Sequence, residues 1–324
     1  MRAVVCKAYG APRDLVVEEV PSPRPAAGEV LVSVKAAGVN FPDVLMIQNK
    51  YQHRQTPPFT PGYEVAGVVK ALGPGVTGVE IGHAGVAMLR AGAFAEEVLV
   101  PAARFWRIPQ DLDFAVAAAF PLAYGTSYHA LKDRGQLKRG ETLLVLGAAG
   151  GVGLAAVQLG KLMGARVIAC ASSDEKLAVC KREGADAVIN YREQNLRDAL
   201  KTLTGEHGVD MCLDPVGGEY AETCVRSMAW GGRYLAVGFT SGEIPRIPTN
   251  LALLKGCSIV GVAWDTYSRR DPEGGRKNVD EMVAWIREGR LKPAVTARYP
   301  LEQAPRALED VMERRAQGKV VIVM

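Results

Sequence analysis

Residues 142–173 contain a glycine-rich turn whose residue types and spacing could bind phosphate. An apolar run, Leu143–Leu146, is followed by G-A-A-G-G-V-G and later by a second apolar run, Val167–Cys170. Apolar residues between the glycines and the second run recur at helical spacing, so the pattern predicts a strand, a turn, a helix and a strand. In such a unit the helix start can bind a pyrophosphate. Gly150 would let the backbone approach the phosphate, and Gly153 would let the helix pack close to the strand.

The end of the second strand indicates which dinucleotide this turn binds. An NAD site usually carries an acidic residue there, but this chain has Ala171-Ser172-Ser173. Hydroxyl groups and a nearby cation suit a 2′-phosphate, which a carboxylate would repel. Ser172 and Lys176 are therefore predicted to bind the 2′-phosphate of NADPH (NADP), although Lys176 could also be an ordinary surface lysine.

The bulk composition is that of an ordinary globular protein and excludes several other classes. The chain of 324 residues is 48% hydrophobic and 23% charged, and its net charge of +4 is spread without a basic block. Nucleic acid and membrane are therefore not expected as partners. The six cysteines form no C-x-x-C pair and the N-terminus has no apolar signal core, so a reducing cytoplasmic location is expected.

Two domains are expected from the order of the predicted elements. Short strands separated by Pro and Gly clusters fill the first 110 residues. Strands then alternate with helices up to Val262, which predicts an α/β, doubly wound parallel sheet, the Rossmann arrangement. A polar loop is expected at Ser268–Arg276, before two further helices and a closing strand at Lys319–Val323. The predicted domains are a mostly-β domain, residues 1–120 and 265–324, and a dinucleotide-binding domain, residues 121–264.

With this order of elements, the whole chain resembles the medium-chain dehydrogenase/reductase superfamily. The resemblance is greatest to its zinc-independent NADPH:quinone oxidoreductase branch. The stretches that carry it are A-A-G-V-N-F-P-D (Ala36–Asp43), P-G-Y-E-V-A-G-V-V (Pro61–Val69), G-A-F-A-E-E-V-L-V-P-A (Gly92–Ala102), the glycine turn and the terminal G-K-V-V-I. The resemblance implies that the mostly-β domain is a GroES-like catalytic domain.

Residues that would bind a catalytic zinc ion in relatives are replaced here. Zinc-dependent relatives have a cysteine at the position of Asn40, a histidine at the position of Tyr63 and a second cysteine near the position of Leu122. No bound metal is therefore expected. A hydride can still pass from NADPH to an electron-poor acceptor without a metal.

The resemblance also implies specific site residues. Asn40 could hydrogen-bond a substrate carbonyl or the nicotinamide ribose, or simply cap a turn. Tyr51 could donate a proton or form a pocket wall. The implied cofactor contacts are Thr126 on the nicotinamide side, backbone N–H groups of Gly150, Gly151 and Val152 at the pyrophosphate, Tyr191 at the 2′-phosphate, Phe239 and Trp264 at the nicotinamide end, and Lys319 facing the phosphates. Phe239, Trp264 and Lys319 could equally be packing or surface residues.

The expected activity is NADPH-dependent hydride transfer to a quinone or a related conjugated carbonyl. One alternative is an enoyl-CoA or enone (2-alkenal) reductase in which Tyr51 donates the proton. An alternative of another class is a non-catalytic NADPH-binding protein. A homodimer is expected from the resemblance, through edge pairing of the apolar strand Ser258–Val262.

Overall fold

Two hydrophobic cores divide the chain into two units in the computed structural model, which describes all residues from 1 to 324. Unit 1 consists of Met1–Leu122, Val279–Arg287 and Pro293–Met324, and unit 2 consists of Ala123–Asn278 and Glu288–Lys292. The first boundary lies close to the expected residue 120. The second differs from the expected one, because residues 265–278 group with unit 2.

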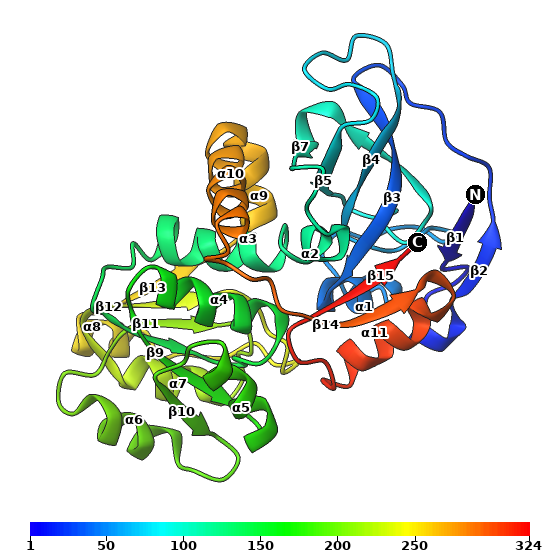
Figure 1. Ribbon diagram of the computed structural model, residues 1–324. Helices are drawn as coiled ribbons and strands as arrows, with labels where there is room; N and C mark the ends of the chain where they lie inside the picture. Colours follow the sequence, from blue (N-terminus) through cyan, green and yellow to red (C-terminus); the bar gives the residue numbers. More distant parts are fainter. The chain divides into compact units, whose positions relative to one another are not determined.

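Unit 2 contains a six-stranded sheet in the order β10-β9-β8-β11-β12-β13, and every neighbouring pair is parallel (Figure 1). The strands are β8 Thr142–Val145, β9 Arg166–Ala171, β10 Ala187–Asn190, β11 Val209–Asp214, β12 Met228–Ala236 and β13 Ser258–Gly261. The chain runs outward from β8 to β10 and then crosses to β11 on the other side of β8. This order creates a topological switch point between β8 and β11 and confirms the doubly wound parallel sheet.

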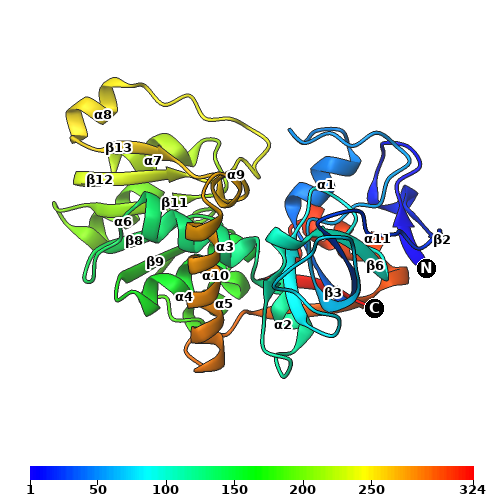
Figure 2. The ribbon, with the colours of Figure 1, turned by 90° about the horizontal axis from the view of Figure 1, so that it is seen from above.

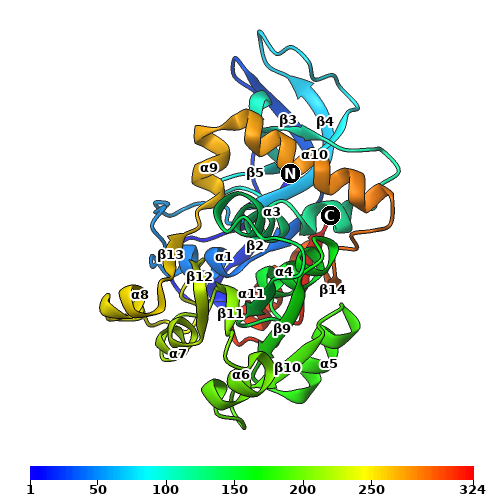
Figure 3. The same ribbon diagram turned by 90° about the vertical axis from the view of Figure 1, so that its left-hand side faces the viewer.

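Helices cover both faces of this sheet. Figure 3 shows α4 (Gly151–Leu162) and α5 (Asp174–Arg182) on one face. On the other face lie α6 (Leu196–Thr204), α7 (Tyr220–Arg226) and α8 (Asn250–Lys255). Leu200, Ala221 and Leu251 from these three helices join Leu144 and Ile168 from the sheet in one buried cluster. No helix of the protein is both long enough and apolar enough to cross a lipid bilayer.

The polar loop expected at Ser268–Arg276 is wrong, because the structure has two helices there. They are α9 (Trp264–Arg270) and α10 (Pro272–Arg287), which are separated by Asp271 alone and run in different directions (Figure 3). Pro272 occupies the first turn of α10, where a missing N–H costs nothing, and Asp271 Oδ1 accepts a hydrogen bond from Gly274 N at 2.9 Å. A Cβ at Gly274 would lie 2.3 Å from the Tyr267 hydroxyl oxygen, so this glycine permits close packing within the helix pair.

Unit 1 is mostly β, as expected. Its main sheet has the order β14-β15-β3-β4-β5-β7, with β6 also paired to β3, and β1 and β2 form a separate hairpin. The strands are β1 Arg2–Val5, β2 Val16–Glu19, β3 Glu29–Val39, β4 Glu64–Leu72, β5 Ala84–Met88, β6 Glu97–Pro101, β7 Trp106–Arg107, β14 Val295–Pro300 and β15 Lys319–Val323. The C-terminal strand β15 pairs antiparallel with the end of β3, with Val320 opposite Val39. Pairing of these distant segments therefore brings Lys319 next to the chain that follows β3.

Three short helices belong to unit 1. They are α1 (Phe41–Ile47), α2 (Phe114–Ala119) and α11 (Ala304–Met312), and α1 and α11 pack against one another (Figure 2). The helix α1 follows β3 directly and was not expected from the sequence. It fixes the direction in which the chain leaves the sheet after Asn40.

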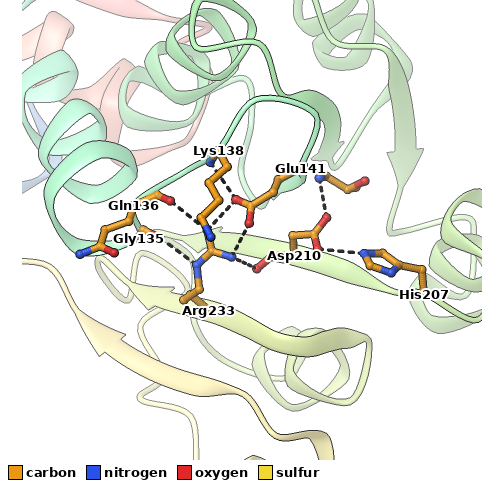
Figure 4. A network of polar contacts seen from close by, with 8 residues as sticks. Gly135, Gln136, Lys138, Glu141, His207, Asp210 and Arg233 are labelled. Carbon is orange, nitrogen blue, oxygen red and sulfur yellow. Dashed lines mark hydrogen bonds and ion pairs between the residues drawn. The ribbon is translucent and has the colours of Figure 1, made fainter.

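A polar network joins the amino ends of three strands in unit 2 (Figure 4). The guanidinium of Arg233 on β12 donates to both carboxylate oxygens of Glu141, at 3.0 and 2.6 Å. It also donates to the carbonyl oxygens of Gly135 at 2.8 Å and Asp210 at 3.1 Å. The Asp210 carboxylate accepts from Thr142 N at 2.8 Å. This network ties β8, β11 and β12 together at the edge opposite to their carboxyl ends.

Replacing Arg233 should lower stability without affecting ligands bound at the carboxyl ends of the strands. Arg233→Met leaves the Glu141 carboxylate, which is only 18% exposed, without its bidentate partner. We expect a loss of about 2–4 kcal/mol in the free energy of unfolding, measured by urea denaturation. The matched control is Arg226→Met, which removes an exposed pair with Glu222 and should cost less than about 1 kcal/mol. Equal losses in the two variants would contradict this account.

Candidate functional site

The glycine turn of unit 2 lies between β8 and α4, at the carboxyl edge of the sheet. Gly150 is the N-cap residue of α4, so the N–H groups of Gly151 and Val152 begin the helix and have no partner within it. A Cβ at Gly153 would lie 2.3 Å from the Gly147 carbonyl oxygen, so only glycine lets α4 approach the turn this closely. The turn and helix start therefore have the geometry of an anion-binding site.

Polar side chains gather at the carboxyl ends of β9 and β10. A hydrogen bond joins the Ser172 and Tyr191 side chains and lowers the pKa of Tyr191, while burial, the largest effect, raises it. Ser173 caps α5, and its Oγ accepts from Lys176 N at 3.5 Å. The structure thus brings Ser172 and Tyr191 into contact and places Lys176 in the first turn of the adjacent helix.

Three residues of this region were missed by the sequence interpretation. The ring centroids of Tyr191 and Tyr220 lie 4.6 Å apart, and the charge of Arg192 acts on both hydroxyl groups. Asn190, which is buried, donates from Nδ2 to Asp174 Oδ1 at 3.1 Å. The carboxylate of Asp174, the first one after the serines, is therefore held by an amide. A cation and an amide flanking Tyr191 were visible in the sequence as N-Y-R.

A buried carboxylate holds the loop after β11 against the strand β12. Asp214, at the end of β11, accepts from Val216 N at 2.6 Å and Gly217 N at 2.8 Å, and the Tyr234 hydroxyl donates to its other oxygen. Burial raises the pKa of Asp214. Phe239 is 42% exposed, and a Cβ at Gly217 would lie 2.8 Å from its ring. Phe239 is therefore accessible in the loop after β12, and its expected contact with the nicotinamide stays a prediction.

Trp264 is buried in unit 2 rather than exposed to a ligand. Its side chain is 2% exposed, and a Cβ at Gly125 would lie 2.4 Å from the indole nitrogen. Gly125 belongs to α3 (Ala123–Tyr128), which also carries the half-buried Thr126 and continues into a π-helix at His129–Arg134. This position fits the interpretation of Trp264 as a packing residue, and its indole ring packs against α3, the helix that contains Thr126.

Unit 1 contains a buried polar cluster, here called the Asn40 cluster, of Asn40, Asp43, Glu64 and Lys319. Lys319 Nζ donates to Glu64 Oε1 at 2.8 Å and to Asn40 Oδ1 at 2.5 Å. Asn40 Nδ2 donates to Glu64 Oε1 at 2.8 Å. All four residues are at most 9% exposed. Lys319 was expected to face cofactor phosphates, but in this structure its ammonium lies inside the cluster.

Asn40 is the N-cap residue of α1, yet its side chain does not cap the helix. Instead, Asp43 Oδ2 accepts a hydrogen bond from Asn40 N at 2.8 Å and holds the helix start. The carboxamide is thereby left for contacts with Glu64 and Lys319. The structure thus disfavours the turn-capping interpretation of Asn40.

Tyr51 follows α1 and lies beside Tyr63. Their ring centroids are 6.0 Å apart in an edge-on arrangement, and the His53 ring lies 5.7 Å from Tyr51. Tyr51 is half-buried, whereas Tyr63, at the position of the zinc-binding histidine of relatives, is 1% exposed. Across the chain, no three or more His, Cys, Asp or Glu side chains are grouped so that they could hold a metal ion.

The combination of a β-rich unit with a doubly wound sheet and a glycine turn after its first strand defines the medium-chain dehydrogenase/reductase superfamily. Two protein families match accordingly. The alcohol dehydrogenase GroES-like domain matches residues 26–110, and the family described as zinc-binding dehydrogenase matches residues 151–286.

Relatives that align with nearly the whole chain identify its family within this superfamily. The chain is 40% identical to quinone oxidoreductase-like protein 2 homolog of Nematostella vectensis, over 99% of this chain and 88% of that protein. It is 32% identical to human quinone oxidoreductase, over 100% of this chain and 98% of that protein. The chain belongs to the quinone oxidoreductase family of this superfamily.

Solved structures share the fold over their whole length. Escherichia coli quinone oxidoreductase complexed with NADPH matches with a TM-score of 0.93 and 29% identity, covering 100% of both chains. Mycobacterial Rv1454c complexed with NADPH also matches with a TM-score of 0.93, at 33% identity and with 100% of both chains covered.

Asp43 should make the stability of the protein depend on pH. Burial, the largest effect, and the nearby Glu64 raise its pKa from 3.8 to about 8, against a smaller lowering by Asn40 N–H and Lys319. The folded chain keeps this proton at pH values where the unfolded chain releases it. Stability from this group is therefore complete below about pH 4 and is lost as the pH rises to about 8, by about 1.4 kcal/mol per pH unit.

Asp43→Asn removes this titration and keeps a carbonyl oxygen for the Asn40 N–H. Between pH 5 and pH 7, the free energy of unfolding of the variant should rise by about 3 kcal/mol relative to that of the original protein. Urea denaturation of both proteins at the two pH values measures this difference. Parallel pH profiles would show that Asp43 is already ionised in the folded chain.

Proposed function

We propose that the protein is a zinc-independent, NADPH-dependent oxidoreductase that reduces quinones or related conjugated carbonyls. The proposal is based on the residues at the carboxyl ends of the strands β8, β9 and β10 in unit 2. There the glycine turn stands beside a strand end with Ser172, Tyr191 and Lys176, and the Asp174 carboxylate accepts a hydrogen bond from Asn190. The family membership supports a quinone as the acceptor.

The cofactor residues act by binding and orienting. The N–H groups of Gly151 and Val152 would hold the pyrophosphate, whereas the Gly150 N–H, also predicted to do so, donates to the Gly147 carbonyl oxygen at 3.0 Å. Ser172, Tyr191 and the cations Lys176 and Arg192 would hold the 2′-phosphate, which distinguishes NADPH from NADH. Bound NADPH supplies a hydride, so a quinone takes up that hydride and one proton to become a hydroquinone while NADP⁺ is formed. Thr126 and Phe239 would line the nicotinamide end.

The residue types at two positions of unit 1 support zinc independence. Asn40 and Tyr63 stand where zinc-dependent relatives have ligands, and both are poor ligands for zinc compared with cysteine and histidine. Polarisation of the acceptor would therefore come from hydrogen bonds and positioning rather than from a metal ion.

We also propose that two copies pair through β13, the edge strand of the unit 2 sheet. Its outer backbone groups have no neighbouring strand, and Ile259 is 45% exposed. Trp230 lies against Gly256, just before β13, and is 84% exposed. A second β13 would cover this edge. The six free thiols suit a reducing compartment such as the cytoplasm, which cell fractionation would test.

Acceptor preference separates the candidate activities. Purified protein should oxidise NADPH faster with a simple quinone than with a short enoyl-CoA, and a chelator should leave the rate unchanged. Tyr51→Phe should then behave like the control Tyr9→Phe, an exposed tyrosine of the same unit. Faster enoyl-CoA reduction that is lost in Tyr51→Phe would favour the enone reductase. NADPH binding without turnover of either acceptor would favour the non-catalytic alternative.

Lys176→Ala should weaken the binding of NADPH but not of NADH. Loss of a charge-assisted contact with the 2′-phosphate should raise the NADPH Kd by about 5- to 30-fold. Fluorescence titration with both cofactors measures the effect, and Lys181→Ala, in the last turn of the same helix, is the control. An equal loss for NADH would remove Lys176 from the 2′-phosphate site.

The mass of the protein in solution tests the pairing of β13. Light scattering should give twice the mass of one chain, and Ile259→Lys should shift the population toward the monomer because it adds charge to the edge. Ile244→Lys, which changes another exposed isoleucine of unit 2, should leave the mass unchanged. A monomeric mass for the original protein would contradict the pairing.

A further inference from the structure

The carboxamide of Asn40 has almost all of its hydrogen-bonding groups occupied inside unit 1. Its Nδ2 carries two hydrogens, and these face the Gly38 carbonyl oxygen at 3.3 Å and Glu64 Oε1 at 2.8 Å. Its Oδ1 has two lone pairs, one of which accepts from Lys319 Nζ at 2.5 Å. One lone pair of Oδ1 is therefore the only capacity left. Asn40 can accept one further hydrogen bond, but it has no N–H left to donate to a substrate carbonyl.

The orientation of this amide follows from the chemistry of its neighbours. An ammonium group only donates and a carboxylate only accepts hydrogen bonds. The amide oxygen must therefore face Lys319, and the amide nitrogen must face Glu64. The Lys319–Glu64 pair thus distinguishes the two ends of the carboxamide, which are nearly equal in shape.

Lys319 has no N–H group left for a phosphate. Its three hydrogens are directed to Asn40 Oδ1, Glu64 Oε1 and the Val39 carbonyl oxygen, the last at 3.3 Å. Its side chain is 2% exposed. Lys319 is therefore placed to act on Asn40 rather than on a ligand.

Glu64 is itself fixed from the other side. Its Oε2 accepts from Leu122 N at 2.7 Å, and its side chain is fully buried. A Cβ at Gly38 would lie 2.2 Å from Glu64 Oε1, so the backbone of β3 closes directly over the carboxylate. The carboxylate cannot rotate away from the amide without losing these contacts.

We propose that Glu64 and Lys319 are positioning residues that hold the Asn40 carboxamide so that its remaining Oδ1 lone pair accepts a hydrogen bond from a hydroxyl group. This inference rests on the proposed function, in which two molecules could supply the hydroxyl. The ribose of the nicotinamide half of NADPH carries hydroxyl groups, and so does a hydroquinone product. A quinone substrate carries none, so Asn40 would not contact its carbonyl oxygens as a donor.

Three variants and two cofactor ligands test this arrangement. The variants are Asn40→Ala, Lys319→Met and the double variant. Calorimetry gives the Kd of NADPH and of 2′-phosphoadenosine 5′-diphosphate, which keeps the phosphates on the adenosine side but lacks the nicotinamide ribose. Inhibition by hydroquinone is measured in parallel. Lys70→Met, which removes an exposed lysine of unit 1, is the control.

Each single variant should weaken NADPH binding by about three- to tenfold, as expected for one hydrogen bond, and should leave the Kd of the adenosine ligand unchanged. The double variant should bind NADPH no more weakly than Asn40→Ala alone, because Lys319 acts through Asn40. If the hydroxyl group belongs to the hydroquinone product, each single variant should instead weaken inhibition by hydroquinone, and the double variant should weaken it no further than Asn40→Ala does.

Other results would overturn the inference. Weaker binding of both cofactor ligands in Lys319→Met would mean that Lys319 contacts a phosphate, and additive losses would mean that the two residues act separately. Asn40→Ala leaves the Lys319–Glu64 pair intact, so it should fold even if Lys319→Met does not. If Asn40→Ala changes neither NADPH binding nor hydroquinone inhibition, the role of Glu64 and Lys319 as positioning residues is refuted and the proposed function is not. If the original protein binds no NADPH, the proposed function is refuted as well.

Discussion

The buried contact between the Lys319 ammonium and the Glu64 carboxylate is the constraint on which unit 1 depends. Removing two charges from water costs several kcal/mol for each, so such a pair is stable only where further hydrogen bonds complete it. Here Asn40, Val39 and Leu122 provide them. Lys319 and Asn40 are 279 positions apart, so the pair forms only when β15 has paired with β3. The orientation of the Asn40 amide therefore depends on the pairing of β15 with β3.

In unit 2 the order of the strands determines where their connecting loops lie. Parallel strands end together at one edge of the sheet, and the order of strands separates their connections at the switch point beside β8. Near the amino ends of the strands, the Arg233 network joins β8, β11 and β12. At their carboxyl ends, Asp214 holds the loop that follows β11 through two backbone N–H groups. Polar networks therefore fix the strands at both ends.

Much of the fold could be predicted from local patterns. The alternation of apolar strands and amphipathic helices from residue 142 to 262 predicted the six-stranded sheet, because both periods are visible in short windows. The helix α9 and the first turns of α10 were missed, because Pro272, Gly274 and Gly275 have the composition of a loop. The strand β14 was not expected from the sequence, and its parallel pairing with β15 makes it part of the sheet.

The sequence by itself determined the class of fold and the position of the glycine-rich turn, because a strand, its glycines and the following helix are adjacent in the chain. It also determined the absence of the zinc-binding residue types at three positions. Only the tertiary structure decided which hydrogen bonds Asn40 and Lys319 form. Asn40 could equally cap a helix or bind a ligand until β15 placed Lys319 against its oxygen, and Lys319 could equally face a phosphate until it was buried. Hydrogen-bond partners far apart in the chain are set by strand pairing, which no local pattern of residues specifies.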